Sequence, residues 1–509
     1  MEPLSTSNRR RLVMGLSILG LLSCVALMVI RLVSAITLDR PFLGQTSGLE
    51  EEALFSVWKA QMGEPVYTDA FSAPFSSSYF NWLFYTAYAV WGKLWNAVRP
   101  VQDAWLPTIW RVLSLAFTLG TWLVLWRAVF KGQAADKGRY SSLFAFCAAG
   151  ICMCNPLFHW MSFSVRPDVG AVFCEVTGFA LLLRHVRHAS MSCVLLAGLA
   201  VALAWSFKQS QVFMFGGGFV YLSWHRRWKE LAAFIAPMII VVTATLSLAG
   251  EWYYQNTILL PALASQFDPI QGIKLAISAM AKAPFMFIGA ILLAPLLLHW
   301  RSLKPELKLV VMSAAVSLPA CLILSSKIGA ADYYYLTPSV FASAVVIGTF
   351  RWPHQAGAGM GKLVQRSGAC GMMLQLIAIG LIFSGNLGRV NIRDDQALAV
   401  RLQQRLVNET GPILVAGRPY NLPWLHPGRP AFVFSFLYPE YERLYPEQFL
   451  QRQGLRPLIG QRYFRLVVQV DDPPLDLSQE LKLSYHLAET GIGYRIYRPR
   501  EPYDQLSSK

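Results

Sequence analysis

Apolar runs separated by short polar segments make up the first three quarters of the chain. Each run approaches the ~20 residues that an α-helix needs to cross a bilayer. The runs lie at 12–36, 107–128, 141–163, 169–184, 191–207, 210–224, 229–250, 283–299, 308–326, 336–350 and 369–385. The pattern predicts a mainly α fold, a polytopic membrane helix bundle of about 11 spans.

One further stretch, 79–98, is rich in aromatic residues and is interrupted by polar ones, which is typical of an interfacial segment. The charged loops decide whether it spans. If 79–98 does not span, the basic loops all lie on the side of the N-terminus, as the positive-inside rule favours. These loops are 127–139, 184–188, 225–229, 300–308 and 351–366. We therefore expect a cytoplasmic N-terminus and a long outer loop at 37–106.

The first outer loop contains a short amphipathic pattern at 48–69. Glu50, Glu51 and Glu52 open it, and Gly63 and Pro65 end it. Its apolar face is formed by Leu54, Val57 and Trp58. The pattern predicts a helix lying on the bilayer surface, with carboxylates where lipid, water and protein meet.

The tail after residue 386 differs from the rest because its apolar runs are short. GPILVAG, PAFVFSF, YFRLVVQV and YRIYRP are typical of strands, and 395–407, 440–453 and 478–490 of helices. We therefore divide the chain into a transmembrane domain at 1–386 and a small extracytoplasmic α/β domain at 387–509.

Composition agrees with a membrane protein, since 54% of the residues are hydrophobic and only 15% are charged. The net charge of +16 lies mainly in short loops between apolar runs, so it indicates orientation and not nucleic-acid binding. The eight cysteines fall in apolar stretches, which gives no disulfide framework or zinc site.

Several polar residues gather at span ends on the predicted outer side. Arg166 and Asp168 flank Pro167 and can pair with each other. Lys208 has no carboxylate within a helical turn, so it needs a distant anionic partner, and a substrate phosphate would serve. Tyr333, Tyr334 and Tyr335 precede a span on the same side, and we include them with these three residues as substrate-binding candidates.

The chain resembles the membrane-embedded C-superfamily (GT-C) glycosyltransferases, whose members include protein O-mannosyltransferases and aminoarabinose transferase. The resemblance is carried by GEPVYTD after the first-loop acids, YFNWLFY, RVLSL, RPD, FKQS and DYYYLTP. It implies a sugar transfer from a polyprenyl-phosphate donor at an outer-facing site. A first-loop carboxylate would act as base and cations would hold the lipid phosphate.

The resemblance leaves the catalytic base open between Glu50 and Glu51, because many members have Asp-Glu where this chain has Glu-Glu-Glu. Glu50 is favoured, since it shares a helix face with Leu54 and Val57. Some relatives bind a divalent metal through several acids. Here only Asp168 offers a second ligand, so a divalent metal is possible but not favoured, and no cofactor is expected.

A transporter or flippase of a lipid-linked or amphiphilic substrate is the alternative. The absence of an internal repeat and the gathering of ionisable residues at one face argue against it. We expect a multi-pass protein of the inner (plasma) membrane. Its partners would be membrane lipids, the polyprenyl-phosphate-linked sugar and a glycan, lipid or protein acceptor, with no nucleic acid.

Overall fold

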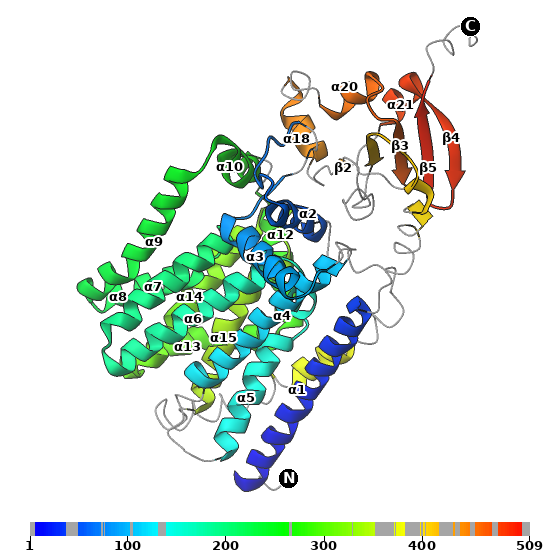
Figure 1. Cartoon of the computed structure of the whole chain (residues 1–509). Helices are drawn as coiled ribbons and strands as arrows, with labels where there is room; N and C mark the ends of the chain where they lie inside the picture. The colour runs from blue at the N-terminus through cyan, green and yellow to red at the C-terminus, as the bar shows by residue number, and fades with distance from the viewer. Residues whose placement is uncertain are drawn as a thin grey trace.

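The computed structural model shows a helical bundle with a small sheet beyond one end (Figure 1). It describes residues 6–36, 49–72, 75, 77–101, 105–130, 139–263, 267–327, 329–351, 371, 373–381, 398, 401–402, 404–416, 431–432, 438–447, 454–470 and 477–500.

The long helices coincide with the predicted apolar runs. They are α1 (Thr6–Ile36), α4 (Leu106–Val124), α5 (Arg139–Cys154), α6 (Pro167–His188), α7 (Met191–Phe207), α8 (Phe213–Trp224), α9 (Trp228–Leu248), α13 (Pro284–Leu298), α14 (Pro305–Ser325) and α15 (Leu336–Arg351). Residues 373–381 are also helical. In the described part of the chain, α4, α6, α9 and α14 are each long and apolar enough to cross a membrane. The mainly α, polytopic prediction is confirmed.

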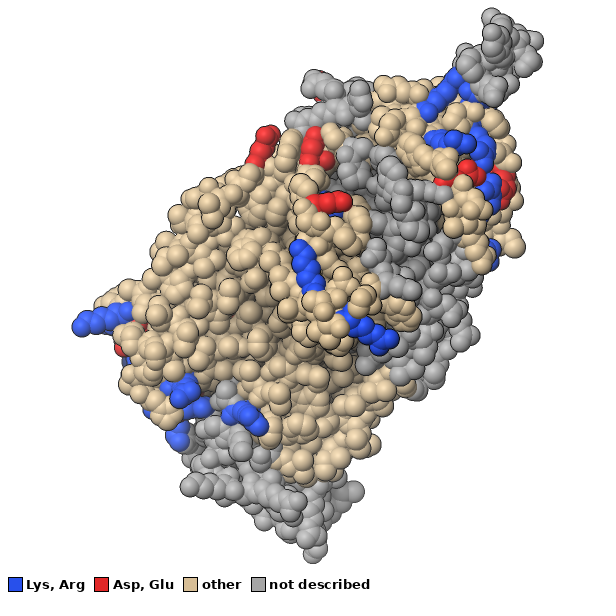
Figure 2. All heavy atoms as spheres, viewed as in Figure 1, with Lys and Arg blue, Asp and Glu red and all other residues tan. Residues whose placement is uncertain are grey.

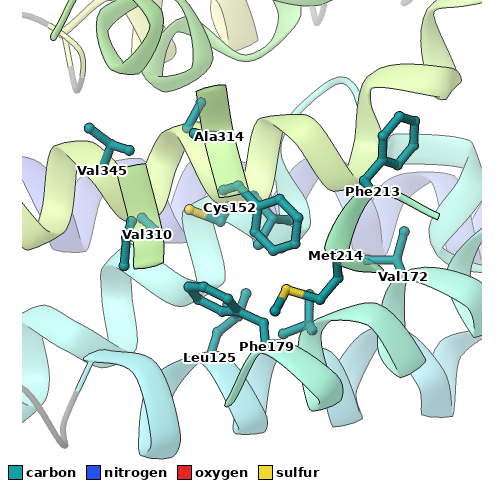
Figure 3. Packing of buried hydrophobic residues seen from close by; sticks show 14 of the residues in the cluster. Leu125, Cys152, Val172, Phe179, Phe213, Met214, Val310, Ala314 and Val345 are labelled. Carbon is teal, nitrogen blue, oxygen red and sulfur yellow. The ribbon is translucent and has the colours of Figure 1, made fainter. Parts of the chain in front are cut away.

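The helices pack through a continuous apolar core that includes Leu125, Phe179, Met214 and Val310 (Figure 3). Small residues allow the closest approaches. A Cβ atom on Gly289 of α13 would lie 2.2 Å from the carbonyl oxygen of Ala342 on α15. Only glycine therefore allows the two backbones to meet at this point.

The two ends of the bundle differ in charge. Basic residues lie in the last turn of α6 and in the segments that join α8 to α9 and α13 to α14, and His185 of α6 lies 3.2 Å from Arg227 of the turn before α9. Figure 2 shows Lys and Arg gathered at the lower left, at the end away from the sheet. The described basic loops therefore share one end, as the loop charges predicted. Most of 127–139 and 351–366 lies outside the described residues.

The first loop forms the other end with α2 (Leu49–Met62) and α3 (Trp82–Val98) (Figure 1). Gly63, with φ of +81°, ends α2 close to the predicted position. Lys59 donates to the carbonyl of Val66 at 2.9 Å, and burial lowers the pKa of its ammonium to about 8. The apolar face of α2 is buried against protein, which corrects the expectation that it lies on the bilayer surface. That face comprises Ala53, Leu54, Phe55 and Val57.

The aromatic helix α3 runs across this end. Before its start, Asn81 donates to the carbonyl of Trp205 near the end of α7 at 2.7 Å. In its middle, Trp91 donates to the carbonyl of Ile109 near the start of α4 at 2.9 Å. Because both partners belong to the same end of the bundle, α3 does not run through the bundle.

A second segment at this end of the bundle holds the first loop in place. It comprises α10 (Glu251–Tyr254), η5 (Gln255–Leu259) and α11 (Leu260–Leu263). The buried side chain of Asn256 accepts from the backbone N–H of Ser78 at 3.0 Å and donates to the carbonyl of Thr68 at 2.8 Å. Gln209 donates to the carbonyls of Tyr79 and Thr257. These amides join the second segment and the first loop to each other and to the turn after α7.

We expect Asn256→Leu to loosen this junction. The substitution leaves a buried N–H and a buried C=O without their partner, at a cost of ~1–3 kcal/mol each. The thermal unfolding midpoint in detergent should fall, and limited proteolysis should cut within 66–81. Ile258→Ala, at an exposed neighbouring position, is the control and should behave like the wild-type protein. If both variants resist proteolysis within 66–81 equally well, Asn256 does not have this role.

The tail contains a sheet in the order β2-β1-β3-β5-β4. Its strands are β1 (Ile413–Ala416), β2 (Ala431–Phe432), β3 (Leu466–Val470), β4 (Tyr485–Gly491) and β5 (Tyr494–Pro499). β1 is parallel to β2 and β3, whereas β5 is antiparallel to β3 and β4. Short helices α18 (Tyr438–Leu444), α20 (Leu455–Gly460) and α21 (Ser478–Ser484) accompany it.

The predicted helix at 478–490 is wrong in its second half. α21 ends at Ser484, and β4 follows because the turn at Gly493, with φ of +85°, lets β4 pair with β5. The sheet domain meets the first loop through aromatic contacts. Phe71 lies 5.7 Å from Tyr445 and Phe75 lies 5.5 Å from Tyr438, measured between ring centroids.

Candidate active site

Glu50 is the second residue of α2, the first helix of the first loop, and is completely buried. Its Oε1 atom lies 3.3 Å from Nε of Arg111, on α4, and accepts the backbone N–H of Val165 at 3.0 Å. Val165 belongs to the segment that leads into α6. Glu50 therefore joins the first loop to the bundle at one charged contact.

The start of α6 supplies the next charged group. Arg166 is in an extended conformation before the helix, and Pro167 occupies the first helical position, where its missing N–H costs nothing. Asp168 follows in the first turn, where the positive end of the helix dipole favours a carboxylate. The sequence RPD thus directs a cation and an anion to the same helix end.

Asp168 lies between two cations. Its Oδ2 atom lies 3.2 Å from Nε of Arg166, and its Oδ1 atom lies 2.6 Å from Nζ of Lys208. Lys208 follows the last residue of α7 in an extended conformation. All three side chains are buried, so these ion pairs are shielded from water. The distant anionic partner predicted for Lys208 is Asp168.

Two of the three predicted tyrosines cover these cations. Cζ of Arg166 lies 4.2 Å from the ring centroid of Tyr333, and Nζ of Lys208 lies 4.4 Å from that of Tyr334. Both distances suit cation–π attraction. Tyr335 does not join them, because its hydroxyl lies 3.0 Å from Oγ of Ser325 on α14.

Hydroxyl groups connect the two charged clusters. Tyr88 on α3 hydrogen-bonds with Oγ of Ser114 at 2.7 Å and donates to the carbonyl of Arg166 at 3.3 Å. Ser114 donates to the carbonyl of Ser164 at 2.7 Å. The segment 164–166 is therefore held by Tyr88 and Ser114. Its residue Val165 binds Glu50, and its residue Arg166 belongs to the second charged cluster. The sequence did not indicate that Tyr88 or Ser114 belongs to the site, because neither residue is part of a charged motif.

We call the cluster of Arg166, Asp168 and Lys208 the cation pair site. Two cations share one carboxylate there, so the site has a surplus of one positive charge. Both terminal nitrogens of Arg166 are buried and make no hydrogen bond of normal geometry to any described residue. Such nitrogens are suited to bind phosphate or carboxylate oxygens. Within the described ranges no three His, Cys, Asp or Glu side chains converge as around a metal ion.

Two other acidic residues complete the comparison with the sequence. The side chain of Glu51 lies outside the described part of the structure. Glu175, seven residues after Asp168, is buried and accepts the backbone N–H of Met214 at 3.2 Å. Glu175 on α6 therefore contacts the N-terminus of α8, the end of a helix that favours a negative charge.

Known structures share this architecture. ArnT from Cupriavidus metallidurans bound to undecaprenyl phosphate is 14% identical, with a TM-score of 0.57, over 93% of this chain and 97% of that chain. Its apo state is 13% identical over the same shares, with a TM-score of 0.54. The Archaeoglobus fulgidus oligosaccharyltransferase with Zn and sulfate is 12% identical over 95% of this chain and 73% of that chain, with a TM-score of 0.48.

No protein-family model matches the chain, and no curated protein sequence does. The likeness to ArnT is therefore one of fold, and it extends over almost the whole of both chains. The helical bundle, the first loop at one end and the small C-terminal sheet together give this chain the same fold as ArnT.

Proposed function

We propose that the chain is an integral-membrane glycosyltransferase that moves a sugar from a polyprenyl-phosphate donor to an acceptor hydroxyl. The observation that carries this proposal is the cation pair site, which lies one residue away from the contact between Val165 and Glu50. A lipid-linked sugar phosphate requires these two functions together. One group must hold the phosphate, and another must activate the acceptor.

Lys208 and Arg166 would bind the donor phosphate. Their surplus positive charge would be neutralised by a phosphate monoanion, and the two terminal nitrogens of Arg166 would gain hydrogen-bond acceptors. Charge on this phosphate increases as its bond to the sugar breaks. Buried cations therefore stabilise the transition state more than the ground state.

Glu50 would act as the general base, with Glu51 as the alternative. It takes the proton of the acceptor hydroxyl while the acceptor oxygen attacks the anomeric carbon. The bond from that carbon to the phosphate oxygen breaks, and polyprenyl phosphate leaves with the bonding electrons. A single displacement of this kind inverts the anomeric centre. Arg111 and the N–H of Val165 would hold Glu50 in place.

The site would face the outside of the plasma membrane. The basic end of the bundle favours the cytoplasm, and the site lies at the opposite end with the sheet (Figures 1 and 2). With this orientation, the N-terminus would lie in the cytoplasm and the C-terminal domain outside it. The acceptor would then be a glycan, lipid or protein of the cell envelope.

Cysteine labelling tests this orientation. Lys304 lies in the basic turn between α13 and α14, and Glu251 begins α10 at the site end, and both are exposed. In intact cells a membrane-impermeant maleimide should label Glu251→Cys and leave Lys304→Cys unlabelled until the membrane is opened. The reverse result would place the site in the cytoplasm. The parent protein is the blank, and its seven described cysteines are buried.

The reaction itself is tested with purified protein, a panel of polyprenyl-phosphate sugars and candidate acceptors. We expect release of polyprenyl phosphate that depends on acceptor and is lost in Lys208→Ala. Tyr335→Phe, outside the cation pair site, is the matched control and should keep activity. Movement of an intact lipid-linked sugar across vesicles, with no release, would favour the transporter reading instead.

A further inference from the structure

Helix α12 (Pro269–Lys282) lies outside the site and outside the predicted spans. Asp268 caps it by accepting the N–H of Ile270 at 2.9 Å. One face packs on the bundle, where Gly272 meets α14 so closely that an added Cβ would lie 3.0 Å from the carbonyl oxygen of Leu322. This packed face also includes Leu275, Ala276, Ala279 and Met280.

The opposite face of α12 is also apolar, and its side chains are exposed. Ile270, Ile273 and Ile277 are 63%, 52% and 62% exposed. Their spacing of three and four residues places them on one side of the helix. A helix that is apolar on both its packed and its open side is not suited to water. In a membrane protein its open side fits lipid chains.

The orientation of α12 supports this partner. α12 and α13 meet at a bend of 110°, so α12 runs across the direction of the next helix. The two helices that α12 contacts also expose isoleucines, Ile291 on α13 and Ile323 on α14. α12 therefore adds exposed apolar side chains next to two helices that themselves expose apolar side chains, which is what a lipid contact requires.

The last turns of α12 contact the tyrosine segment. Lys282 forms an ion pair with Asp332, and Ser278 donates to the same carboxylate oxygen at 3.0 Å. Asp332 begins η7 (Asp332–Tyr335), which presents Tyr333 and Tyr334 to the cations. Gln375 fixes the end of α12 by donating to the carbonyl of Lys282 at 3.3 Å.

We propose that α12 is a bilayer-interface helix, and that Ser278 and Lys282 are positioning residues that hold Tyr333 and Tyr334 against Arg166 and Lys208. The partner of the isoleucine face is the phospholipid bilayer. The effect on the cations rests on the proposed function, because it matters only where they bind the donor phosphate. Docking of α12 in lipid would thus fix the aromatic side of the phosphate site.

The lipid contact is tested by spin labels at Ile273→Cys and Ile277→Cys in the full chain, reconstituted in phosphatidylcholine vesicles. Oxygen, which partitions into lipid, should relax both labels more than a water-soluble nickel chelate does. Lys304→Cys, in the basic turn, is the control and should show the reverse. Relaxation of the isoleucine positions mainly by nickel would show a water-exposed face. Low access to both reagents would show a protein partner. Either result overturns the lipid contact.

The positioning role is tested by binding of polyprenyl phosphate alone to Lys282→Met and Ser278→Ala. We expect affinity to fall about fivefold or more in Lys282→Met, within the usual range for coupling between sites, and Lys282→Arg to restore it. Lys274→Met, on the same helix and exposed, is the control and should bind normally. A lower unfolding temperature with unchanged affinity would show that the ion pair has only a structural role.

The same assay separates failure of this inference from failure of the proposed function. If Lys208→Ala weakens binding and Lys282→Met does not, the positioning role is wrong and the phosphate site stands. If neither variant weakens binding, both are wrong.

Discussion

Glu50→Gln is expected to lower turnover by ~10² to 10⁴-fold, the range for loss of a general base, with donor binding largely kept. Glutamine has nearly the same size, and its carbonyl can still accept the N–H of Val165. It cannot accept the proton of the acceptor hydroxyl. The measurement is steady-state release of polyprenyl phosphate, together with binding of the unreacted donor. Glu51→Gln is the neighbouring comparison.

The contact with Arg111 gives Glu50 a second possible role, because the carboxylate also balances a buried cation. Glu50→Gln removes the negative charge that balances this buried cation, which by itself can distort the site. The double variant Glu50→Gln with Arg111→Met removes both charges. A base role predicts that the double variant stays inactive even where its stability recovers. Recovery of turnover would show that Glu50 serves only to neutralise Arg111, and full activity of both single glutamate variants would overturn the first-loop site.

The elements that could be predicted from sequence are those whose signal is local. An apolar run of span length has few alternatives to a helix, so the bounds of α6, α7 and α14 lie close to the predicted ones. The end of α2 was predictable because Gly63 adopts a left-handed conformation that favours glycine. Strands β1, β3 and β5 followed from short β-branched runs.

The elements that escaped prediction depend on distant partners. β4 has a helical composition and becomes a strand because β5 pairs with it. α12 is too short and too polar at its ends to count as a span, and its orientation is set by α13 and α14. Burial of α2 was missed because its apolar face packs against α3, within an apolar cluster that also includes residues of the tail such as Leu402 and Leu406.

The candidate site shows the same division. RPD at the start of α6 placed Arg166 and Asp168 together by local geometry. The pairing of Lys208 with Asp168 joins residues 40 positions apart, and that of Arg111 with Glu50 joins residues 61 apart. Sequence reasoning identified the need for a partner of Lys208 and could not identify it, because the partner is set by the packing of α6 against α7.

Lys208→Met is expected to weaken donor binding strongly and also to destabilise the fold. Removing one partner of a buried ion pair typically costs ~3–5 kcal/mol. Here Arg166 remains on the other oxygen of Asp168, so we expect a cost at or below the lower end of that range. Donor affinity and the unfolding midpoint must therefore be measured on the same samples.

A double variant separates the two effects. Lys208→Met with Asp168→Asn leaves Arg166 as the single charge, so the surplus of one positive charge is the same as in the wild-type site. If Lys208 binds the phosphate directly, the double variant should regain stability and remain weak in donor binding. If only the net charge of the site attracts the donor, affinity should return together with stability. Unchanged donor affinity in Lys208→Met would instead leave Lys208 with no role beyond holding Asp168, because a cation that contacts the phosphate cannot be removed without loss of binding.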